Sequence, residues 1–337
     1  MSSSVDGPDD SLDIGRAIDR LVRARILVVG DAMLDRYIFG RVRRMSPEAP
    51  VPVLTMATEL DEPGGAGNVV HNLCALGAAV AFVSVVGDDA AGAELTGLIG
   101  GQPGVEPWLL VQGGRVTTVK TRYVAEGSRQ GGQQLLRTDR EDTRPIHPKL
   151  AERLQRIARD AMAATSVVVL SDYRKGVLAG EVPAQLIAAA HAANRRVVVD
   201  MRAADFARYA GADVLIPHRA DLDPTADELP EGDAEIAAAA QAVRAAHGIG
   251  AVLVKRGEEG LSLVDAEGAV HFRLDPALLV DLSGAGDAAV ATMAAGVAAG
   301  LPVRLAALLA NAAAGVVGAR PGTGVVRCED LRAVLVE

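Results

Sequence analysis

Short runs of β-branched residues alternate with longer Ala- and Leu-rich stretches along most of the 337-residue chain. A short, continuous apolar run is typical of a strand buried on both faces, whereas apolar positions spaced three and four apart indicate a helix. Chains in which the two kinds of segment alternate usually fold as a parallel sheet covered by helices. The pattern therefore predicts an α/β fold with a central, mostly parallel sheet.

The predicted elements follow one another with short connections. Strands are expected at 26–30, 81–86, 166–170, 196–200, 214–216 and 251–255. Helices are expected at 67–76, 90–99, 148–164, 182–193 and 234–247. The most apolar region, 288–319, is split by Pro302 and Arg304 into two runs, each shorter than the ~20 residues that a membrane span needs. Two buried helices are expected there.

Two stretches, 36–58 and 105–137, interrupt this alternation because they lack helical periodicity and contain alternating apolar and polar residues. Such alternation is typical of strands with one exposed face. Since the two stretches flank helical units, we expect them to leave the main domain as a small second sheet that forms a lid. Residues 24–335 are expected to form one domain, preceded by a tail and a leading helix in residues 1–23.

Composition limits the classes of partner. The 34 Lys and Arg against 43 Asp and Glu leave a net charge of −9, which argues against a general nucleic-acid binder. Cys74 and Cys328 lie far apart and suggest neither a disulfide framework nor a zinc site. The N-terminus has no signal-peptide pattern. We therefore expect a cytoplasmic protein that binds small molecules, and neither nucleic acid nor a membrane.

The strongest chemical motif is Val280-Asp-Leu-Ser-Gly-Ala-Gly-Asp287, directly before a predicted helix. Small residues at 284–286 allow backbone N–H groups to point at an anion, and the helix N-terminus adds roughly half a positive charge. Asp287, in the first turn, is expected to stay ionised and to accept a hydroxyl proton. Alternatively, Asp287 only caps the helix and the glycines only form the turn, and the spacing alone favours neither interpretation.

The same segment matches the degenerate dinucleotide-binding pattern G-x-G-x-x-A. A dinucleotide site needs an acidic residue about 20 positions later to hold the ribose. However, no Asp or Glu occurs between Asp287 and Glu329, which disfavours an oxidoreductase. The chain also lacks a GxxxxGK[ST] loop, so phosphate transfer would proceed without that lysine.

A second group of candidates follows the first strand and opens the next helix, at 30–35 and 63–68. Ligands of parallel-sheet proteins bind at the carboxyl edge of the strands, where these segments are expected to lie. The alternative is that they only form a turn and a tightly packed helix start. The candidates for contacts with sugar hydroxyls are Asp31, Asp35, Gly64, Gly65 and Asn68.

Basic residues on this acidic chain form a third group. Most such residues are solvated, but several lie in the expected lid, where a charged substrate would meet them. The candidates for binding a substrate phosphate are Arg44, Lys120, Arg122 and Lys175.

Together these motifs resemble the ribokinase-like (PfkB-type) sugar kinases, over roughly residues 24–335. The segments 64–68 and 281–287 look like the two signatures of that family. Within the family, five segments look like those of the kinases that act on D-glycero-β-D-manno-heptose 7-phosphate: 30–37, 44–53, 134–137, 171–176 and 281–287, of which the run 45–52 is the most specific. The resemblance implies a three-layer α/β sandwich with a small β-sheet lid, which often builds a homodimer.

The resemblance also implies ATP and Mg²⁺ as cofactors, with a monovalent cation as an optional third. Asp287 would be the base, and the backbone at Gly284, Ala285 and Gly286 would stabilise the developing charge. The residues implied at the nucleotide are His218, Asp221, Lys255, Gly257, Ser283 and Asn311, with Asp221 also implied as a Mg²⁺ ligand.

The implied reaction transfers the γ-phosphoryl group of ATP to O1 of the heptose 7-phosphate, giving the 1,7-bisphosphate. Bifunctional relatives carry a nucleotidyltransferase after the kinase, so a separate protein is expected to perform that later step. The alternatives are a kinase for another sugar or nucleoside, and a catalytically weak sugar-phosphate-binding protein.

Two segments depart from the family pattern. Asp200-Met201-Arg202 stands where Asp-Pro-Lys is expected, and His218-Arg-Ala-Asp221 stands where Asn-x-x-Glu is expected. Arg202 retains a cation and Asp221 retains a carboxylate. These replacements favour a divergent but functioning kinase over an inactive one.

Overall fold

The centre of the protein, seen in a computed structural model that describes residues 8–127, 132–202, 205–222 and 229–336, is a nine-stranded sheet. The strand order is β13-β12-β11-β10-β9-β8-β1-β4-β5. Neighbours from β11 to β5 pair in parallel, and β12 and β13 add an antiparallel edge. The strands are β1 Arg25–Gly30, β4 Ala79–Gly87, β5 Val105–Gln112, β8 Val167–Asp172, β9 Arg196–Met201, β10 Val214–Ile216, β11 Ala251–Lys255, β12 Leu261–Asp265 and β13 Gly268–Phe272.

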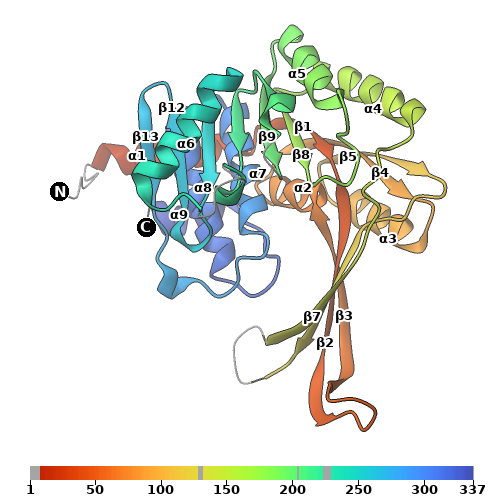
Figure 1. Ribbon diagram of the computed structural model, residues 1–337. Coiled ribbons are helices and arrows are strands. Elements are labelled where there is room, and N and C mark those ends of the chain that lie inside the picture. Colours follow the sequence, from red (N-terminus) through yellow and green to blue (C-terminus); the bar gives the residue numbers. More distant parts are fainter. Residues whose placement is uncertain (1–7, 128–131, 203–204, 223–228, 337) are drawn as a thin grey trace.

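Helices cover both faces of this sheet (Figure 1). They are α1 Pro8–Leu21, α2 Ala66–Ala75, α3 Ala90–Gly100, α4 Pro148–Ala161, α5 Val182–Ala192, α6 Gly232–His247, α7 Ala285–Ala298, α8 Val303–Gly318 and α9 Cys328–Leu335. Because side chains alternate along a strand, Ile26 and Val28 enter one core with α2, α7 and α8, whereas Leu27 and Val29 enter the other with α4 and α5. The predicted α/β fold is confirmed.

The leading helix α1 belongs to the main domain. Its side chains Ala17, Ile18 and Leu21 are fully buried in the same core as α7 and α9. The expected boundary at residue 24 therefore does not separate two bodies. Residues 1–7 of the expected tail lie outside the described part of the chain.

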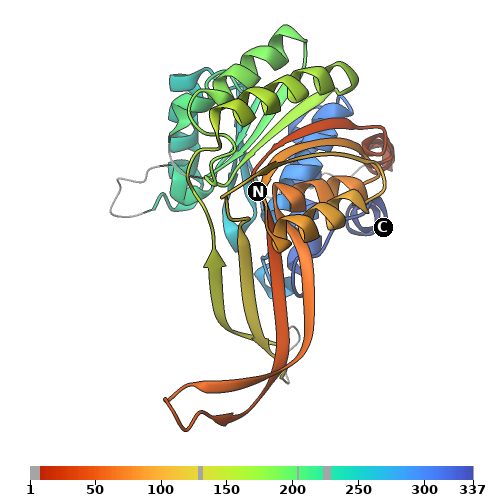
Figure 2. The ribbon, with the colours of Figure 1, turned by 90° about the vertical axis from the view of Figure 1, so that its right-hand side faces the viewer.

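The small second sheet has the order β3-β2-β6-β7. Its strands are β2 Ala32–Met45, β3 Pro52–Gly65, β6 Val119–Ala125 and β7 Gln133–Arg140. Strands β2 and β3 project from the body as a long ribbon (Figures 1 and 2). Because β2 begins two residues after β1 ends, the base of this sheet lies at the carboxyl edge of the large sheet.

One part of the lid expectation is corrected. The segment 105–112 is β5, which pairs in parallel with β4 at the edge of the large sheet and does not join the second sheet. As an edge strand it is exposed along much of its length, so its sequence has the half-exposed pattern that we expected of a lid strand. Within the expected range 105–137, residues 128–131 lie outside the described residues.

The apolar region 288–319 forms two helices, α7 and α8, as predicted from Pro302 and Arg304. A Cβ on Gly296 would lie 2.7 Å from the Cβ of Ala306, so the two helices approach more closely than larger side chains would allow. Among the described residues, no helix is both long enough and apolar enough to cross a membrane.

Candidate functional site

The N-terminus of α7 lies against α2 and the strands β1, β8 and β9. Gly284, the residue before α7, adopts a left-handed conformation with φ 79°. A Cβ there would lie 3.0 Å from Asn68 Nδ2, so glycine is required both by the backbone and by the contact with α2. The turn uses the Ala285 N–H, which donates to Leu282 O at 3.2 Å. Of the expected anion-binding amides, the one at Ala285 is therefore occupied by the chain itself.

Asp287 is held by two donors from distant segments. The Tyr173 hydroxyl donates to Asp287 Oδ1 at 2.5 Å, and Asn68 Nδ2 donates to Asp287 Oδ2 at 2.7 Å. Burial, together with the negative charge of Asp200, raises the pKa of Asp287 to about 6. Desolvation therefore outweighs any lowering of this pKa by the helix N-terminus. The carboxyl is nevertheless mostly ionised at pH 7, with a pKa in the range that suits a general base.

A buried ion pair lies beside this carboxylate. Lys255 Nζ at the end of β11 pairs with Asp200 at the end of β9, and both side chains are almost fully buried. A Cβ on Gly286 would lie 3.4 Å from Lys255 Cδ, so the lysine lies directly below the start of α7. The Arg202 guanidinium stacks over the Tyr173 ring at 5.1 Å.

His218 follows β10 next to Lys255. Burial, with the positive charges of Lys255 and Arg202, lowers the pKa of His218 to about 2, so the ring is neutral. Its Nε2 is buried without a hydrogen-bond partner in the described structure. Asp221 Oδ2 accepts the His218 backbone N–H at 2.9 Å and so caps the short turn 219–221.

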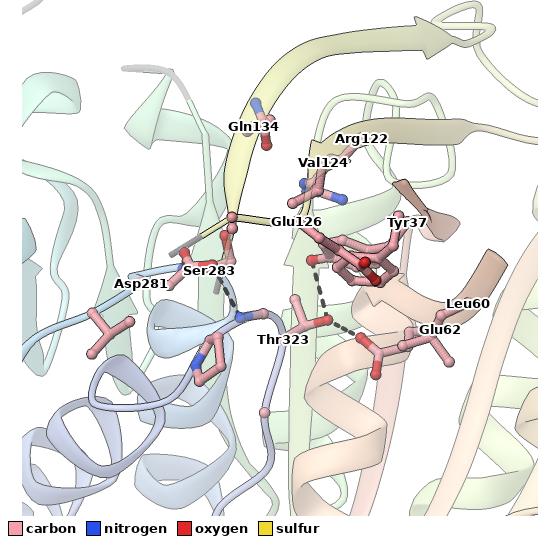
Figure 3. A pocket seen from close by; sticks show the side chains of 17 residues that line it. Tyr37, Leu60, Glu62, Arg122, Val124, Glu126, Gln134, Asp281, Ser283 and Thr323 are labelled. Carbon is pink, nitrogen blue, oxygen red and sulfur yellow. Dashed lines mark hydrogen bonds between the residues drawn. The ribbon is translucent and has the colours of Figure 1, made fainter. Parts of the chain in front are cut away.

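A cavity of ≈ 820 Å³ lies between the base of the small sheet and the loops on either side of α7 and α8 (Figure 3). Arg122 on β6 lines it and donates to Asp35 Oδ1 at 2.9 Å. A Cβ on Gly64 would lie 2.5 Å from Asp35 Oδ2, so only glycine leaves room for this carboxylate. The cavity wall also includes Tyr37, Leu60, Glu62, Gln134, Val280, Asp281, Ser283 and Thr323.

Glu62 and Thr323 close one side of this cavity. The Thr323 hydroxyl donates to Glu62 and lies 3.3 Å from the Tyr37 hydroxyl (Figure 3). Burial raises the pKa of Glu62. We did not predict Tyr37, Glu62, Tyr173 or Thr323 from the sequence. In the β2–β3 hairpin Glu62 pairs with Asp35. The small sheet expected from the sequence begins at residue 36 and therefore does not include this pair.

Asp31 does not face the substrate side. Its carboxylate, 1% exposed, accepts the backbone N–H groups of residues 173, 175 and 177 at 2.9, 2.9 and 3.0 Å. Burial and the charge of Asp172 raise its pKa to about 6. Asp31 therefore holds the loop after β8, and the expected contact of Asp31 with a sugar hydroxyl is not supported. Gly65, with φ 57°, packs against the Asp31 carbonyl.

The four basic candidates do not converge. Arg44 is exposed on β2 five residues beyond Phe39, which lines the cavity, or roughly 17 Å at the rise of a strand. Lys175 pairs with Glu141 at 2.5 Å, and Lys120 pairs with Asp139 at 3.1 Å. Arg122 is the candidate that lines the cavity.

Three further nucleotide-side candidates lie just before α7, in the middle of α8 and just after β11: Ser283, Asn311 and Gly257. Ser283 N donates to Asp281 Oδ1 at 2.9 Å, and the other oxygen of Asp281 accepts the Gly322 N–H at 3.0 Å. Asn311 Nδ2 donates to Arg273 O at 3.1 Å, and its Oδ1 is buried without a partner in the described structure. Gly257, with φ 67°, begins a short turn after β11.

Comparison with known proteins supports one family. The model of the pfkB family carbohydrate kinases matches residues 23–328. The bifunctional protein HldE of Acidiphilium cryptum (strain JF-5) is 56% identical over 323 residues, which are 96% of this chain and 65% of that protein. For HldE of Rhodospirillum rubrum the identity is 45% over 329 residues, with 97% and 65% covered. The chain thus spans about 65% of the length of these relatives.

Solved structures show the same fold at low identity. Phosphofructokinase-2 from Escherichia coli in complex with fructose-6-phosphate has a TM-score of 0.75 at 20% identity, covering 93% of this chain and 98% of that one. Arabidopsis thaliana ribokinase complexed with ribose and ATP has a TM-score of 0.69 at 20% identity, covering 93% and 99%. The expected ribokinase-like architecture is confirmed. From its fold, its family match and its relatives, the chain belongs to the PfkB family and is an ATP-dependent carbohydrate kinase.

Proposed function

We propose that this kinase transfers the γ-phosphoryl group of ATP to O1 of D-glycero-β-D-manno-heptose 7-phosphate, giving the 1,7-bisphosphate. The observation that carries the proposal is the carboxylate of Asp287, held in the first turn of α7, four residues after Ser283, which lines the cavity of ≈ 820 Å³. The choice of heptose rests on the segments 45–52, 134–137 and 171–176, and on relatives that match almost the whole chain.

The proposed chemistry assigns one task to each group. Asp287 takes the proton from the sugar hydroxyl as its oxygen attacks the γ-phosphorus, and the bond to the β-phosphate oxygen breaks to release ADP. The amides at Gly284 and Gly286, at the helix N-terminus, stabilise the charge that develops on the phosphoryl oxygens. Transfer of this kind depends mainly on positioning and charge stabilisation.

The sugar is proposed to lie in the cavity beside Asp35, Arg122 and Asn68. Asp35 Oδ2, kept clear by Gly64, is positioned to accept from a sugar hydroxyl. Arg122, which pairs with Asp35, is the cation proposed to meet the substrate phosphate, since it is the one of the four basic candidates that lines the cavity.

The donor set fits a metal that is held mainly by the nucleotide. Within the described residues, no three His, Cys, Asp or Glu side chains gather into a metal cluster. Mg²⁺ in kinases is bound by one or two carboxylates together with substrate phosphates, so this arrangement is sufficient. We propose Asp221 as the carboxylate, with His218, Lys255, Ser283, Gly257 and Asn311 bordering the nucleotide. When bound, Mg²⁺ would neutralise charge on the phosphates.

We further propose that two copies associate through the small sheet. This sheet exposes apolar side chains, including Met45, Met56 and Leu136, each with more than half of its surface accessible. Arg44, which lies far from the cavity of its own chain, would then be available only to the partner or to solvent.

Product analysis tests the proposed reaction. The protein is incubated with ATP, Mg²⁺ and one of several sugar phosphates, and the products are identified by phosphorus NMR. We expect a new anomeric phosphate on heptose 7-phosphate and little turnover of fructose 6-phosphate or free ribose. Better turnover of another sugar would replace the substrate assignment. Release of ADP without phosphorylation of any sugar would indicate a sugar-phosphate-binding protein that hydrolyses ATP weakly.

A further inference from the structure

We propose that Tyr173 is a positioning residue for the catalytic carboxylate, which it holds together with Asn68 from the opposite side. The proposal deepens the function above and rests on it, because Asp287 is its base. Tyr173 comes from the turn after β8 and Asn68 from the first turns of α2, so the carboxylate is gripped by two parts of the chain that meet only in the folded protein.

The hydrogen-bond geometry leaves the carboxylate usable. Tyr173 donates to Oδ1 at 2.5 Å and Asn68 donates to Oδ2 at 2.7 Å, so each oxygen receives one donor. A carboxylate oxygen has two lone pairs, so each oxygen keeps one to accept a proton. With both oxygens held, the carboxylate cannot rotate about its Cβ–Cγ bond, and its free lone pairs keep a fixed direction. Such fixed orientation accelerates transfer reactions.

The backbone of the loop that carries Tyr173 is held by buried carboxylates. The Asp31 carboxylate accepts the N–H groups of Tyr173, Lys175 and Val177, and the Arg174 N–H donates to Asp172 Oδ1 at 2.8 Å. Arg174 adopts φ 58°, a conformation that a residue with a side chain rarely takes. The loop is thus held by two buried carboxylates at the ends of β1 and β8. The role of Asp31 is explained: it places the phenol against Asp287.

The charges around the pair act in known directions. The hydrogen bonds from Tyr173 and Asn68 and the charge of Lys255 lower the pKa of Asp287, whereas burial and Asp200 raise it. Burial and the neighbouring Asp287 raise the pKa of Tyr173 well above its ordinary value, so the phenol remains a donor throughout the working range. Arg202 stacks on the Tyr173 ring, and its positive charge lowers the pKa of Tyr173 without cancelling this rise, whereas His218 is neutral.

Replacing the phenol tests the proposal. In Tyr173→Phe the ring remains and one hydrogen bond to the carboxylate is lost, so the pKa of Asp287 should rise by about one unit. We expect kcat/KM for the sugar to fall at least tenfold at pH 7, with the acid limb of its pH profile shifted upward and the KM for ATP unchanged. Because a substrate phosphate titrates in the same range, variants are compared with one and the same substrate.

Tyr209→Phe is the matched control. Tyr209 is also a buried tyrosine, and its hydroxyl donates to Asp172 at 2.5 Å, so its loss disturbs one anchor of the same loop but leaves the Tyr173 hydrogen bond to Asp287 in place. It should lose similar stability but keep the pH profile of the wild type. The positioning role would be overturned if the acid limbs of the two variants coincided and kcat/KM of Tyr173→Phe lay within twofold of that of Tyr209→Phe.

A readout without turnover separates this claim from the proposed function. The Asp287 carboxyl is titrated by carbon NMR in the wild type, in Tyr173→Phe and in Tyr209→Phe, with Asp287→Asn used for assignment. An upward shift in Tyr173→Phe alone supports the positioning role whichever sugar is the substrate. No shift refutes it even if heptose 7-phosphate is the best substrate. Full activity of Asp287→Asn would instead refute the function on which the proposal rests.

Discussion

At the scale of single residues, desolvation decides the chemistry of the carboxylates. Asp31 and Asp287 both have a pKa raised to about 6, and in each case burial is the largest cause. The backbone and side-chain hydrogen bonds that each receives oppose burial without cancelling it. A base with such a pKa is ionised at neutral pH, yet it is basic enough to accept a proton from a sugar hydroxyl.

Asp287→Asn should abolish transfer while sparing the fold. Loss of a general base typically costs 10²–10⁴-fold in rate. The pKa of Asp287 is higher in the folded than in the unfolded protein, so the folded state binds more protons. The free energy of unfolding therefore falls as the pH rises from about 4 to 6. The Asn variant lacks this penalty and should be more stable than the wild type by about 3 kcal/mol at pH 8, but not at pH 4.

The check on this prediction combines kcat with thermal unfolding at the two pH values. The Asn side chain can satisfy both Tyr173 and Asn68, so a large loss of stability is not expected. More than about a tenth of wild-type kcat in Asp287→Asn would reject the base assignment.

Gly64→Ala should impair sugar binding selectively. Its Cβ would lie 2.5 Å from Asp35 Oδ2, so Asp35 must move and its ion pair with Arg122 must break. We expect the KM for the sugar to rise at least tenfold, with the KM for ATP little changed. Gly97→Ala on α3, where a Cβ meets nothing within 4 Å, is the control. Equal effects of the two substitutions on the sugar KM would remove Asp35 from the site.

Some residue roles were predictable and others were not. Asp287 and the glycines before it form a local motif, so the sequence predicts their place at the start of a helix, where α7 begins. Asp31 and Asp35 lie four residues apart, and nothing local shows that Asp31 would bind backbone amides of the loop at 173–177. Tyr173 bonds a residue 114 positions away, and such a contact exists only once the tertiary fold is known.

At the scale of elements, burial on both faces made the large sheet predictable. The strands β1, β8, β9, β10 and β11 are almost continuously buried, and their apolar runs are correspondingly unbroken. The error at β5 has the opposite cause. This strand has only one neighbour in the sheet, so its exposed positions resemble those of the second sheet.

The contact of α7 with α8 is predicted to tolerate no larger residue at Gly296. A Cβ there would meet the Ala306 Cβ at 2.7 Å, so Gly296→Leu must push the helices apart. Overpacking of this kind typically costs about 1–3 kcal/mol of the free energy of unfolding. Urea unfolding of the variant gives this value, and Gly296→Ala combined with Ala306→Gly should be less destabilised than Gly296→Ala alone. An unchanged midpoint in Gly296→Leu would contradict the close packing.

At the scale of the whole molecule, the projecting small sheet is the feature that a single copy leaves unexplained. Its apolar side chains are exposed along β3 and β7, and β7 is exposed at all its positions. Exposed apolar patches of this kind often mark protein interfaces. The same sheet lines one side of the cavity, so association of two copies would also stabilise that wall.

Dimer formation is testable by sedimentation velocity. We expect twice the mass of the chain at micromolar concentration, and at least tenfold weaker association for Met56→Lys combined with Leu136→Lys. Val334→Lys on α9, at a position 59% exposed on the main body, should leave association unchanged. A wild-type protein that sediments as a monomer at high micromolar concentration would rule out the proposed dimer.

The most direct test of the central claim compares kcat/KM for heptose 7-phosphate with kcat/KM for the same heptose without its phosphate. A charge-assisted contact to a phosphate contributes roughly 1.5–3 kcal/mol, and remote binding energy can be used to orient the reacting hydroxyl. One such contact, from Arg122, implies at least about a tenfold preference for the phosphorylated sugar. A preference of that size, lost in Asp287→Asn together with all turnover, is the predicted result. Equal kcat/KM values for the two sugars in the wild type would contradict the assignment of this chain as a heptose 7-phosphate kinase.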